Sequence, residues 1–330
     1  MYRPGLITGS AEGLGAASGV IRHEIPRECV RRGVAWWLIP LCMLAPFSKG
    51  NVNVVFFGEG CITAATPAGD VSADTVRTAI LPLYKNFGIE RNIELRILKR
   101  SAQPQHGKSA GGEVQIVFNH QVRLPKTLHL LNPGRVKKVR GVAYCVEVPK
   151  SNNDGMIHGA KGVLKTFVPD TSIFTDAPRA PLINTDVKGH ASGKVKGAVG
   201  FGLSLVAESS TGCLYSADVC SPPEGGVPAD EIGKQCALQL LEKISQGGCV
   251  ESVAAPTVLM LMAMGSEDVG RLALGRDVLA SEEVIQLARD SKAFGGSGWG
   301  FRDPGGDEEK IEVVVSVVGR GVGNVGRKAA

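Results

Sequence analysis

Residues 200–207 read GFGLSLVA, and residues 213–219 read CLYSADV. Two apolar runs of this length, with a short polar turn between them, predict a β-hairpin. Residues 229–244 follow with apolar positions at helical spacing, and they predict an amphipathic helix that ends at Gly247 and Gly248. A hairpin followed by a helix indicates a protein of the α/β or α+β class.

The pattern of strands and helices continues outward from this hairpin. Toward the N-terminus, strands are expected over residues 51–57, 93–98, 113–118 and 142–148. Helices are expected over residues 28–44, broken near Pro40, and 72–87, capped by Ser72 and ended by Gly88. Before the hairpin, we expect a helix over 154–167, a strand over 172–175 and a long polar loop over 176–198. After it, we expect an apolar stretch over 251–264, a helix over 281–294, a glycine-rich loop over 296–309 and a strand over 311–318.

The composition is that of an ordered globular protein. Hydrophobic residues make up 43% and charged residues 21%, which excludes a wholly disordered chain. The 43 glycines and the low aromatic content of 5% argue against a coiled coil. The net charge of +5 permits a nucleic-acid partner without establishing one. The 330 residues suggest about two domains; we expect a small inserted domain over 150–247 and a large domain over 1–149 and 248–330.

Neither a membrane span nor a metal site is expected. The most apolar stretch, residues 34–47, contains Pro40 and is shorter than the roughly 20 residues that a membrane span needs. The first ten residues lack the pattern of a signal peptide. The eight cysteines form no C-x-x-C pair, so we expect reduced, buried thiols in an intracellular protein.

Three stretches match loose nucleotide-binding motifs, but their surroundings argue against each. TGSAEGLG at 8–15 fits a short-chain dehydrogenase turn, yet it lacks a preceding strand, and the chain lacks the Tyr-x-x-x-Lys pair. AQPQHGKS at 102–109 fits a loose P-loop, yet a strand is expected after it where a P-loop needs a helix. GVGNVG at 321–326 is followed by four residues only. An NAD(P)-dependent dehydrogenase therefore stays a minor alternative.

Several short segments carry a family resemblance. They are YRPGLITG at 2–9, LAPF at 44–47, LPL at 81–83, FGI at 87–89, GGEV at 111–114, RGVAY at 140–144, GFGLSLVAE at 200–208 and GGCVES at 247–252. In number, order and spacing they resemble the RNA 3′-terminal phosphate cyclase superfamily, and more closely its eukaryotic cyclase-like branch. The resemblance implies a large domain of repeated two-helix, four-stranded units and a smaller inserted α/β domain. It also implies that the first repeat is incomplete at the N-terminus.

The resemblance implies that function depends on a histidine that this chain lacks. Cyclases of this superfamily take AMP from ATP on a histidine near the C-terminal end, because a neutral imidazole is nucleophilic near pH 7. The histidines of this chain are His23, His106, His120, His129, His158 and His190. The segment where the cyclase histidine would fall, residues 275–281, reads GRDVLAS. We therefore expect no adenylylation, no cofactor and a protein that has lost cyclase catalysis.

Two groups of charged residues are candidate RNA-contacting sites. One is a basic run that we expect to bind RNA or another anion: Arg135, Lys137, Lys138 and Arg140. The other ends the helix expected over 281–294, where Asp290 as a base and Arg289 and Lys292 as phosphate-stabilising cations would form a nuclease cluster. Lys188, Lys194 and Lys196 are expected to be solvated loop residues.

The resemblance to the cyclase-like branch implies a role in ribosome biogenesis. Such a protein would act in the nucleus and nucleolus, in the small-subunit processome, with pre-rRNA and a Bms-type GTPase as partners. The alternatives that the sequence leaves are an endoribonuclease that cleaves pre-rRNA, an active ATP-dependent RNA 3′-phosphate cyclase and the dehydrogenase.

Overall fold

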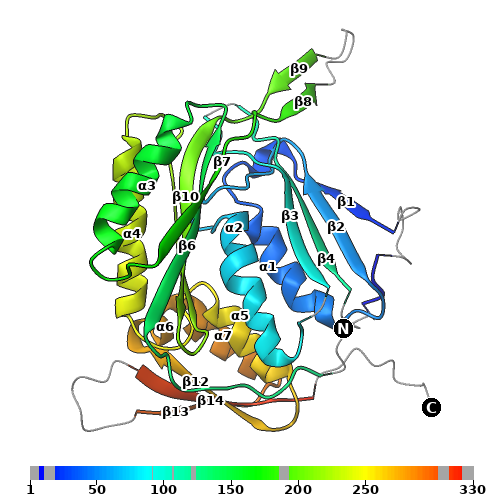
Figure 1. The fold of residues 1–330 in the computed structure, drawn as a ribbon. Helices are drawn as coiled ribbons and strands as arrows, with labels where there is room; N and C mark the ends of the chain where they lie inside the picture. Colours follow the sequence, from blue (N-terminus) through cyan, green and yellow to red (C-terminus); the bar gives the residue numbers. More distant parts are fainter. Residues whose placement is uncertain are drawn as a thin grey trace.

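The computed structural model describes residues 7–10, 19–90, 92–105, 108–119, 124–185, 193–303 and 312–321. These residues form three four-stranded sheets and one two-stranded sheet, with helices packed against the larger sheets (Figure 1). The architecture is mixed α/β, as the sequence predicted.

The first unit is a four-stranded sheet with two helical segments. Its elements are β1 (Ile21–Glu24), α1 (Ala35–Leu44), β2 (Val52–Phe57), a helical segment over residues 73–87, β3 (Ile93–Lys99) and β4 (Glu113–Phe118). The strand order is β1-β2-β4-β3; β1 is parallel to β2, and the other neighbours are antiparallel. Val114, Ile116 and Phe118 alternate with half-buried residues along β4, so one face of the sheet packs on the helices.

The helix predicted over 28–44 is wrong in two respects. Residues Arg27–Cys29 form only a short 3₁₀ turn, and α1 begins at Ala35. Pro40 lies inside α1 without breaking it. A proline removes one helical hydrogen bond, but Leu38 and Cys42 on either side of it are fully buried. Tertiary packing of this kind, rather than local propensity, supplies most of a helix's stability.

The helix predicted over 72–87 is present, but its geometry changes along its length. It consists of α2 (Ala73–Thr75), a π-helical turn over Val76–Ile80 and a 3₁₀ segment over Leu81–Phe87. The Ser72 hydroxyl accepts a hydrogen bond from the Thr75 amide at 3.1 Å, which confirms the cap. Gly88, with φ of +78°, ends the segment in a conformation that favours glycine.

A second unit repeats the topology of the first. Its elements are β5 (His129–Leu130), α5 (Ala255–Met264), β12 (Val269–Gly275), α6 (Arg276–Leu279), α7 (Glu282–Ala293), β13 (Gly300–Arg302) and β14 (Glu312–Val318). The order β5-β12-β14-β13 matches β1-β2-β4-β3, again with the first pair parallel and the rest antiparallel. The repeated two-helix, four-stranded unit is therefore confirmed.

The glycine-rich loop predicted over 296–309 is wrong in part, because β13 lies within it. Phe301 pairs with Val315 and Gly300 with Ser316, so the regular strand β14 recruits this short segment as its edge neighbour. Residues 304–309 lie outside the described residues.

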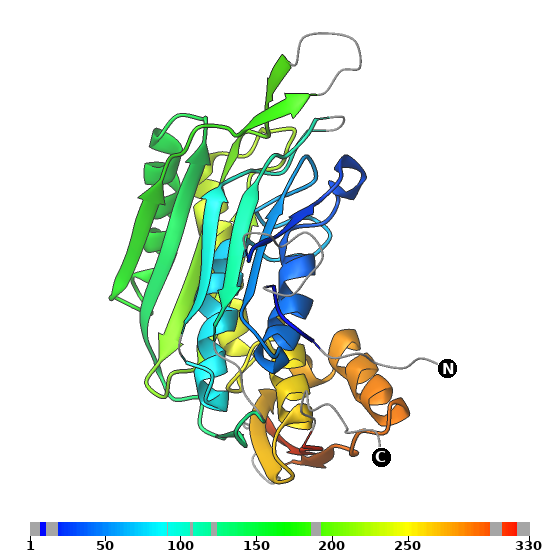
Figure 2. The same cartoon turned by 90° about the vertical axis from the view of Figure 1, so that its right-hand side faces the viewer.

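The insert separates β5 from α5 of the second unit. Its elements are β6 (Val136–Val146), α3 (Ser151–Leu164), β7 (Thr171–Asp176), β10 (Gly200–Ser209), β11 (Leu214–Cys220) and α4 (Ala229–Ser245). The sheet order is β11-β10-β6-β7, and the predicted hairpin of β10 and β11 is confirmed. Helices α3 and α4 lie side by side on one face of this sheet (Figures 1 and 2).

Two glycines allow α3 and α4 to approach so closely. A Cβ on Gly159 would lie 2.1 Å from the Asp230 carbonyl oxygen, and one on Gly233 would lie 2.1 Å from the Met156 carbonyl oxygen.

The predicted domain boundary at residue 150 falls after strand β6, although β6 pairs with β7 and β10 of the insert. The domain boundaries at residues 150 and 248 stay a prediction.

The loop predicted over 176–198 contains a two-stranded arm. β8 (Leu182–Thr185) and β9 (Gly193–Lys196) pair antiparallel and extend away from the body of the molecule (Figure 1). The apolar pair Ile183 and Val195 lies in register within this polar stretch, which explains the difference from the prediction. Lys188 lies outside the described residues.

The eight cysteines are free thiols; six are buried, and Cys29 and Cys220 are half-buried. Burial of these six agrees with the predicted buried thiols. Among the helices of the described residues, none combines the length and the apolarity that crossing a membrane requires.

Candidate functional site

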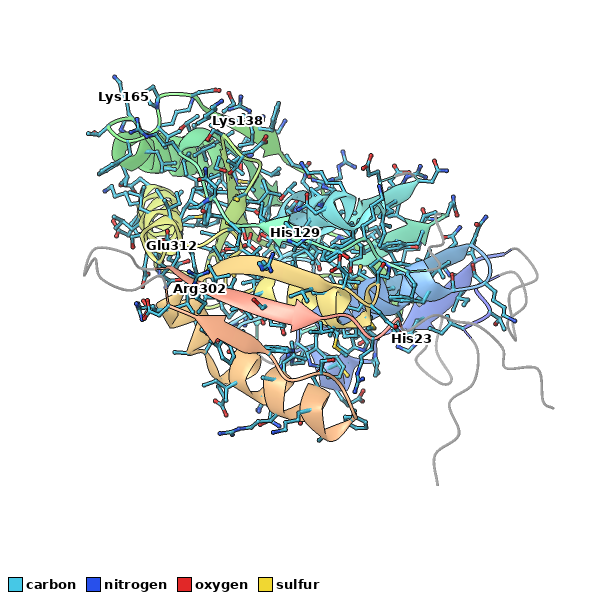
Figure 3. All side chains as sticks on the ribbon, turned by 90° about the horizontal axis from the view of Figure 1, so that it is seen from below. His23, His129, Lys138, Lys165, Arg302 and Glu312 are labelled. Carbon is cyan, nitrogen blue, oxygen red and sulfur yellow. The ribbon has the colours of Figure 1, made fainter. Side chains whose placement is uncertain are left out.

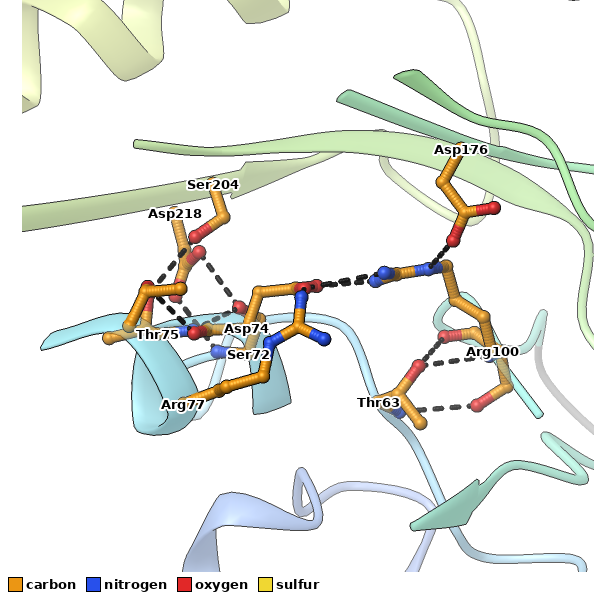
Figure 4. Close-up of polar contacts among 11 residues, drawn as sticks. Thr63, Ser72, Asp74, Thr75, Arg77, Arg100, Asp176, Ser204 and Asp218 are labelled. Carbon is orange, nitrogen blue, oxygen red and sulfur yellow. Dashed lines mark hydrogen bonds and ion pairs between the residues drawn. The ribbon is translucent and has the colours of Figure 1, made fainter. Parts of the chain in front are cut away.

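A buried charge network joins the first unit to the insert (Figure 4). Arg100, directly after β3, donates through Nη2 to Asp74 Oδ1 at 3.3 Å and through Nε to Asp176 Oδ2 at 2.9 Å. Its Nη1 makes a further hydrogen bond to Asp74 Oδ2. Arg77, one turn along the same helical segment, donates to Asp74 Oδ1 at 2.8 Å. Both Asp74 and Arg100 are almost fully removed from solvent, so the pair is a buried ion pair.

An aromatic ring completes the surroundings of Arg100. Its guanidinium carbon lies 4.7 Å from the centre of the Tyr144 ring on β6, a cation–π distance. Burial by itself lowers the pKa of Arg100, but the Asp74 carboxylate outweighs burial, and the pKa stays above its ordinary value. Arg100 therefore remains charged, and its charge is matched by carboxylates from both parts of the protein.

A second set of polar contacts lies at the start of α2. The Ser72 amide and hydroxyl donate to the two carboxylate oxygens of Asp218 on β11, each at 2.9 Å. The Thr75 and Ser204 hydroxyls are 3.2 Å apart. Burial raises the pKa of Asp218, although the hydrogen bonds oppose that rise. The first turn of the helical segment over residues 73–87 is thus fixed to strands β10 and β11 of the insert.

A similar contact joins the insert to the chain that enters the second unit. The Ser216 amide donates to Glu251 Oε2 at 2.9 Å, and the Ser216 hydroxyl donates to Oε1. Burial raises the pKa of Glu251 to about 7. The nearby Asp218 adds to this rise, whereas the Ser216 hydrogen bonds and Lys243 oppose it. The Glu251 side chain therefore titrates near neutral pH while it holds β11.

These carboxylates have partners, so the network is suited to holding the parts together rather than to acid–base chemistry. A general base needs a proton-accepting atom free to meet a substrate, and here Asp74 and Asp218 are occupied by arginine and serine donors. Within the described ranges, no group of three or more histidine, cysteine or acidic side chains could hold a metal ion.

A cavity of about 590 Å³ lies where the arm, the first unit and the insert meet. Lys108 lines it and donates to Gln105 Oε1 at 2.7 Å, while the Ser109 hydroxyl donates to Glu59 at 2.7 Å. The loop leads into strand β4, so the predicted failure of the P-loop match is confirmed. The remaining walls are mostly apolar.

The basic run 135–140 begins strand β6, which starts earlier than the predicted 142. Lys138 forms an ion pair with Glu208 at 2.9 Å, and Arg140 forms one with Asp170 at 2.8 Å. Because side chains alternate along a strand, Lys137 points to the opposite face of the sheet from these two. Arg135 and Lys137 are exposed. RNA binding by this run stays a prediction.

The structure places Arg289, Asp290 and Lys292 on the exposed side of α7. Asp290 Oδ1 accepts a hydrogen bond from Gln286 Nε2 at 2.8 Å. Arg289 and Lys292 are three residues apart and share one helical face, whereas Asp290 and Lys292 are two apart and do not face each other. The helix itself does not bring the predicted base and the second cation together.

The segment 275–281 forms the end of β12 and helix α6, where Arg276 pairs with Asp303 at 2.8 Å. The fold nevertheless brings one imidazole into the sheet of the second unit. His129 on β5 pairs in register with Arg271 on β12, four residues before Gly275 (Figure 3). Sequence reasoning missed this placement, because a two-residue strand before an insert gives no periodic signal.

The amino-acid sequence is similar to that of RNA 3′-terminal phosphate cyclases and cyclase-like proteins. A sequence model described as the insert domain of RNA 3′-terminal phosphate cyclase (RTC) matches residues 131–245, the stretch that contains the insert sheet and its two helices. The chain is 36% identical over 298 residues to the RNA 3′-terminal phosphate cyclase-like protein of Mus musculus, covering 89% of this chain and 70% of that protein.

Two further relatives match nearly the whole chain. The rRNA processing protein rcl1 of Schizosaccharomyces pombe is 32% identical over 99% of this chain and 80% of its own length. The rRNA processing protein RCL1 of Saccharomyces cerevisiae is 31% identical over 100% of this chain and 80% of its own length. The chain belongs to the family of RNA 3′-terminal phosphate cyclase-like proteins.

Proposed function

We propose that this protein acts in rRNA processing, as a component of the small-subunit processome in the nucleolus, and that it has no cyclase activity. The observation that carries the proposal is the similarity along 99% and 100% of the chain to two proteins named for rRNA processing. The similarity includes both units and the insert, so it concerns the whole assembly of domains rather than one shared module.

The residues of the second unit support the loss of cyclase chemistry. Transfer of AMP to the protein needs a nucleophilic side chain at the reacting phosphorus. In residues 275–281 the polar side chains are those of Arg276, Asp277 and Ser281. A guanidinium is protonated at neutral pH, and a serine needs an adjacent base. We therefore propose a binding and assembly role.

The partners in this proposal are pre-rRNA and a Bms-type GTPase. Among the candidate cations, those that are exposed are Arg135 and Lys137 on the insert and Arg289 and Lys292 on α7. Contacts with phosphate are dominated by such cations and weaken steeply with salt. A pull-down from nuclear extract at two salt concentrations separates the partners, because RNA-dependent recovery falls with salt and with nuclease treatment.

The decisive experiment is complementation. In cells depleted of their own cyclase-like protein, this chain is expected to restore pre-rRNA cleavage and small-subunit rRNA, measured by hybridisation to precursor species.

The triple variant R289A/D290A/K292A distinguishes an assembly role from nuclease chemistry. Purified protein that cleaves pre-rRNA only with these three residues intact would establish the endoribonuclease. An acid-labile adduct with labelled ATP would establish the cyclase, and failure to rescue or to associate with pre-rRNA overturns the proposal.

A further inference from the structure

Two cysteines, far apart in the sequence, lie against each other at the base of the insert. Leu214 and Val250 form an isolated parallel bridge, so the residues just before them, Cys213 and Cys249, are also opposite each other. Neighbouring strands are about 4.8 Å apart, which lies inside the range of about 4.4–6.8 Å that the Cα atoms of a disulfide span. Each thiol also shifts the pKa of the other.

The surrounding contacts hold both sulfur atoms in place. The Tyr215 hydroxyl donates to the Gly248 carbonyl at 2.7 Å, and the Cys249 amide donates to the Ala273 carbonyl of β12 at 2.8 Å. These bonds fix the segment 248–250 between β11 and the second unit. Both cysteines are fully buried, yet the Thr211 hydroxyl lies 3.5 Å from the Cys213 sulfur, and Thr211 itself is exposed. One residue thus separates this sulfur from solvent.

We propose that Cys213 and Cys249 form a reversible disulfide when the protein meets a hydroperoxide, and that this bond ties the insert to the second unit. Nothing in the RNA-processing role requires it, so the proposal stands apart from the proposed function. The other cysteines do not share the arrangement: Cys29 and Cys220 are more accessible, but they lie in the first unit and on β11 of the insert, respectively.

The electrostatics support Cys213 as the attacking thiol. The neighbouring Cys249 thiol lowers the pKa of Cys213 below its ordinary value, against the effect of burial, and the Thr211 and Ser209 hydroxyls add to the lowering. The Cys213 thiol and burial together raise the pKa of Cys249. A thiolate, rather than a thiol, is the nucleophile.

The reaction balances without any further reductant. The Cys213 thiolate attacks one peroxide oxygen, the O–O bond breaks, and the departing hydroxide takes a proton to give water, leaving Cys213 as a sulfenic acid. The Cys249 sulfur then attacks the Cys213 sulfur, the S–O bond breaks, and the departing hydroxide takes the Cys249 proton to give a second water. The two thiols lose two electrons and two protons, and hydrogen peroxide gains them. A dithiol reductant reverses the bond by exchange.

The experiment treats the folded full-length chain with hydrogen peroxide, blocks the remaining thiols under denaturing conditions and maps the peptides by mass spectrometry. We expect a cross-linked peptide pair that contains Cys213 and Cys249, and that dithiothreitol separates. Because the pKa of Cys213 is lowered, its oxidation by peroxide should continue at a pH at which an ordinary thiol is protonated and unreactive. In Cys249→Ser, a dimedone-type probe should trap the Cys213 sulfenic acid, and the cross-link should be lost.

The more accessible cysteines provide the internal control. Non-selective oxidation would reach Cys29 and Cys220 first, because they are half-buried, and denatured protein should react in that unselective way. Oxidation of these two while Cys213 and Cys249 stay reduced overturns the proposal, as does native wild-type protein without the cross-linked pair. Because the wild-type mapping needs no substitution, the result does not depend on whether a variant folds.

Discussion

Strand β7 is held at its two ends by two arginines, each of which pairs with an aspartate but in very different surroundings. Asp170, just before the strand, pairs with Arg140, and Asp176, its last residue, pairs with Arg100. The Arg140 side chain is 37% exposed and comes from the same sheet, whereas the Arg100 side chain is 5% exposed and comes from the first unit. One end of β7 therefore belongs to a surface, and the other belongs to a junction between domains.

Burial decides which of these charges stabilise the fold. An exposed pair gains little, because water and salt screen it. A buried charge that loses its partner has no water to replace it, so removal of one member is strongly destabilising. The basic run at residues 135–140 lies at the exposed end, while Arg100, on which the junction depends, follows Lys99 at the end of a strand and has no sequence feature that marks it as buried.

The largest effect is expected at the buried end. Arg100→Met leaves the Asp74 carboxylate buried with only Arg77 beside it, and should lower the free energy of unfolding by about 4 kcal/mol, measured by urea denaturation. Arg140→Met is the matched control, and we expect its midpoint to stay within error of the wild type. Equal losses in the two variants would remove the distinction between junction and surface.

The second test uses the pH dependence of the other junction. The pKa of Glu251 is about 7 in the folded protein, against an ordinary value of 4.5. The folded state therefore keeps a proton that the unfolded state releases, and this contribution to stability is present below pH 4.5 and is lost as pH rises to about 7. The loss should amount to about 3 kcal/mol. Glu251→Gln, which remains neutral, should flatten that part of the profile of unfolding free energy against pH; an unchanged slope would show that other groups cause it.

Two helix-capping serines give a smaller and cleaner comparison. The Ser72 hydroxyl accepts a hydrogen bond from the Thr75 amide and donates one to Asp218. Ser281 occupies the N-cap position of α7, but its side chain makes no capping hydrogen bond, and its buried hydroxyl has no partner among the described residues. Ser72→Ala should cost about 1–2 kcal/mol of unfolding free energy. Ser281→Ala should be neutral or slightly stabilising in the same thermal or urea measurement. A larger loss at Ser281 would contradict the contacts described here.

The smallest effects are expected at two glycines. Gly88 has φ of +78°, and a Cβ there would lie 2.9 Å from the Lys126 side chain. Gly88→Ala should therefore lower the unfolding free energy by about 1 kcal/mol. Gly162 is exposed within α3, and nothing lies within 4 Å of an added Cβ. Gly162→Ala should raise stability by about 0.5–1 kcal/mol, so the two substitutions should move the melting temperature in opposite directions.

Elements with a strong local pattern were predictable from the sequence. Alternation along residues 113–118, the apolar run at 311–318 and the helical spacing along 229–244 each predicted an element, and the structure has a strand or helix at each. The elements that failed lack such a pattern or contradict it. α1 continues through Pro40 while Leu38 and Cys42 of the same helix pack in the core. β13 and the arm strands exist because a neighbouring strand pairs with them.

The candidate sites divide in the same way. The exposed cations could be located by counting charge, but the sequence could not show that Lys138 and Arg140 already have carboxylate partners. Nor could it show that His129 joins the sheet of the second unit, since the insert separates it from β12 along the chain.

Local patterns were enough to predict the fold class and to show that residues 275–281 contain no histidine, because periodicity and residue identity can be read along the chain. The repeated unit and its insert were expected only from the family resemblance. Which charges are buried together depends on tertiary packing. Arg100, Asp74 and Asp176 meet, and Cys213 meets Cys249, because separate sheets pack against one another. Proximity between residues distant in the chain is a property of that packing, and no local pattern encodes it.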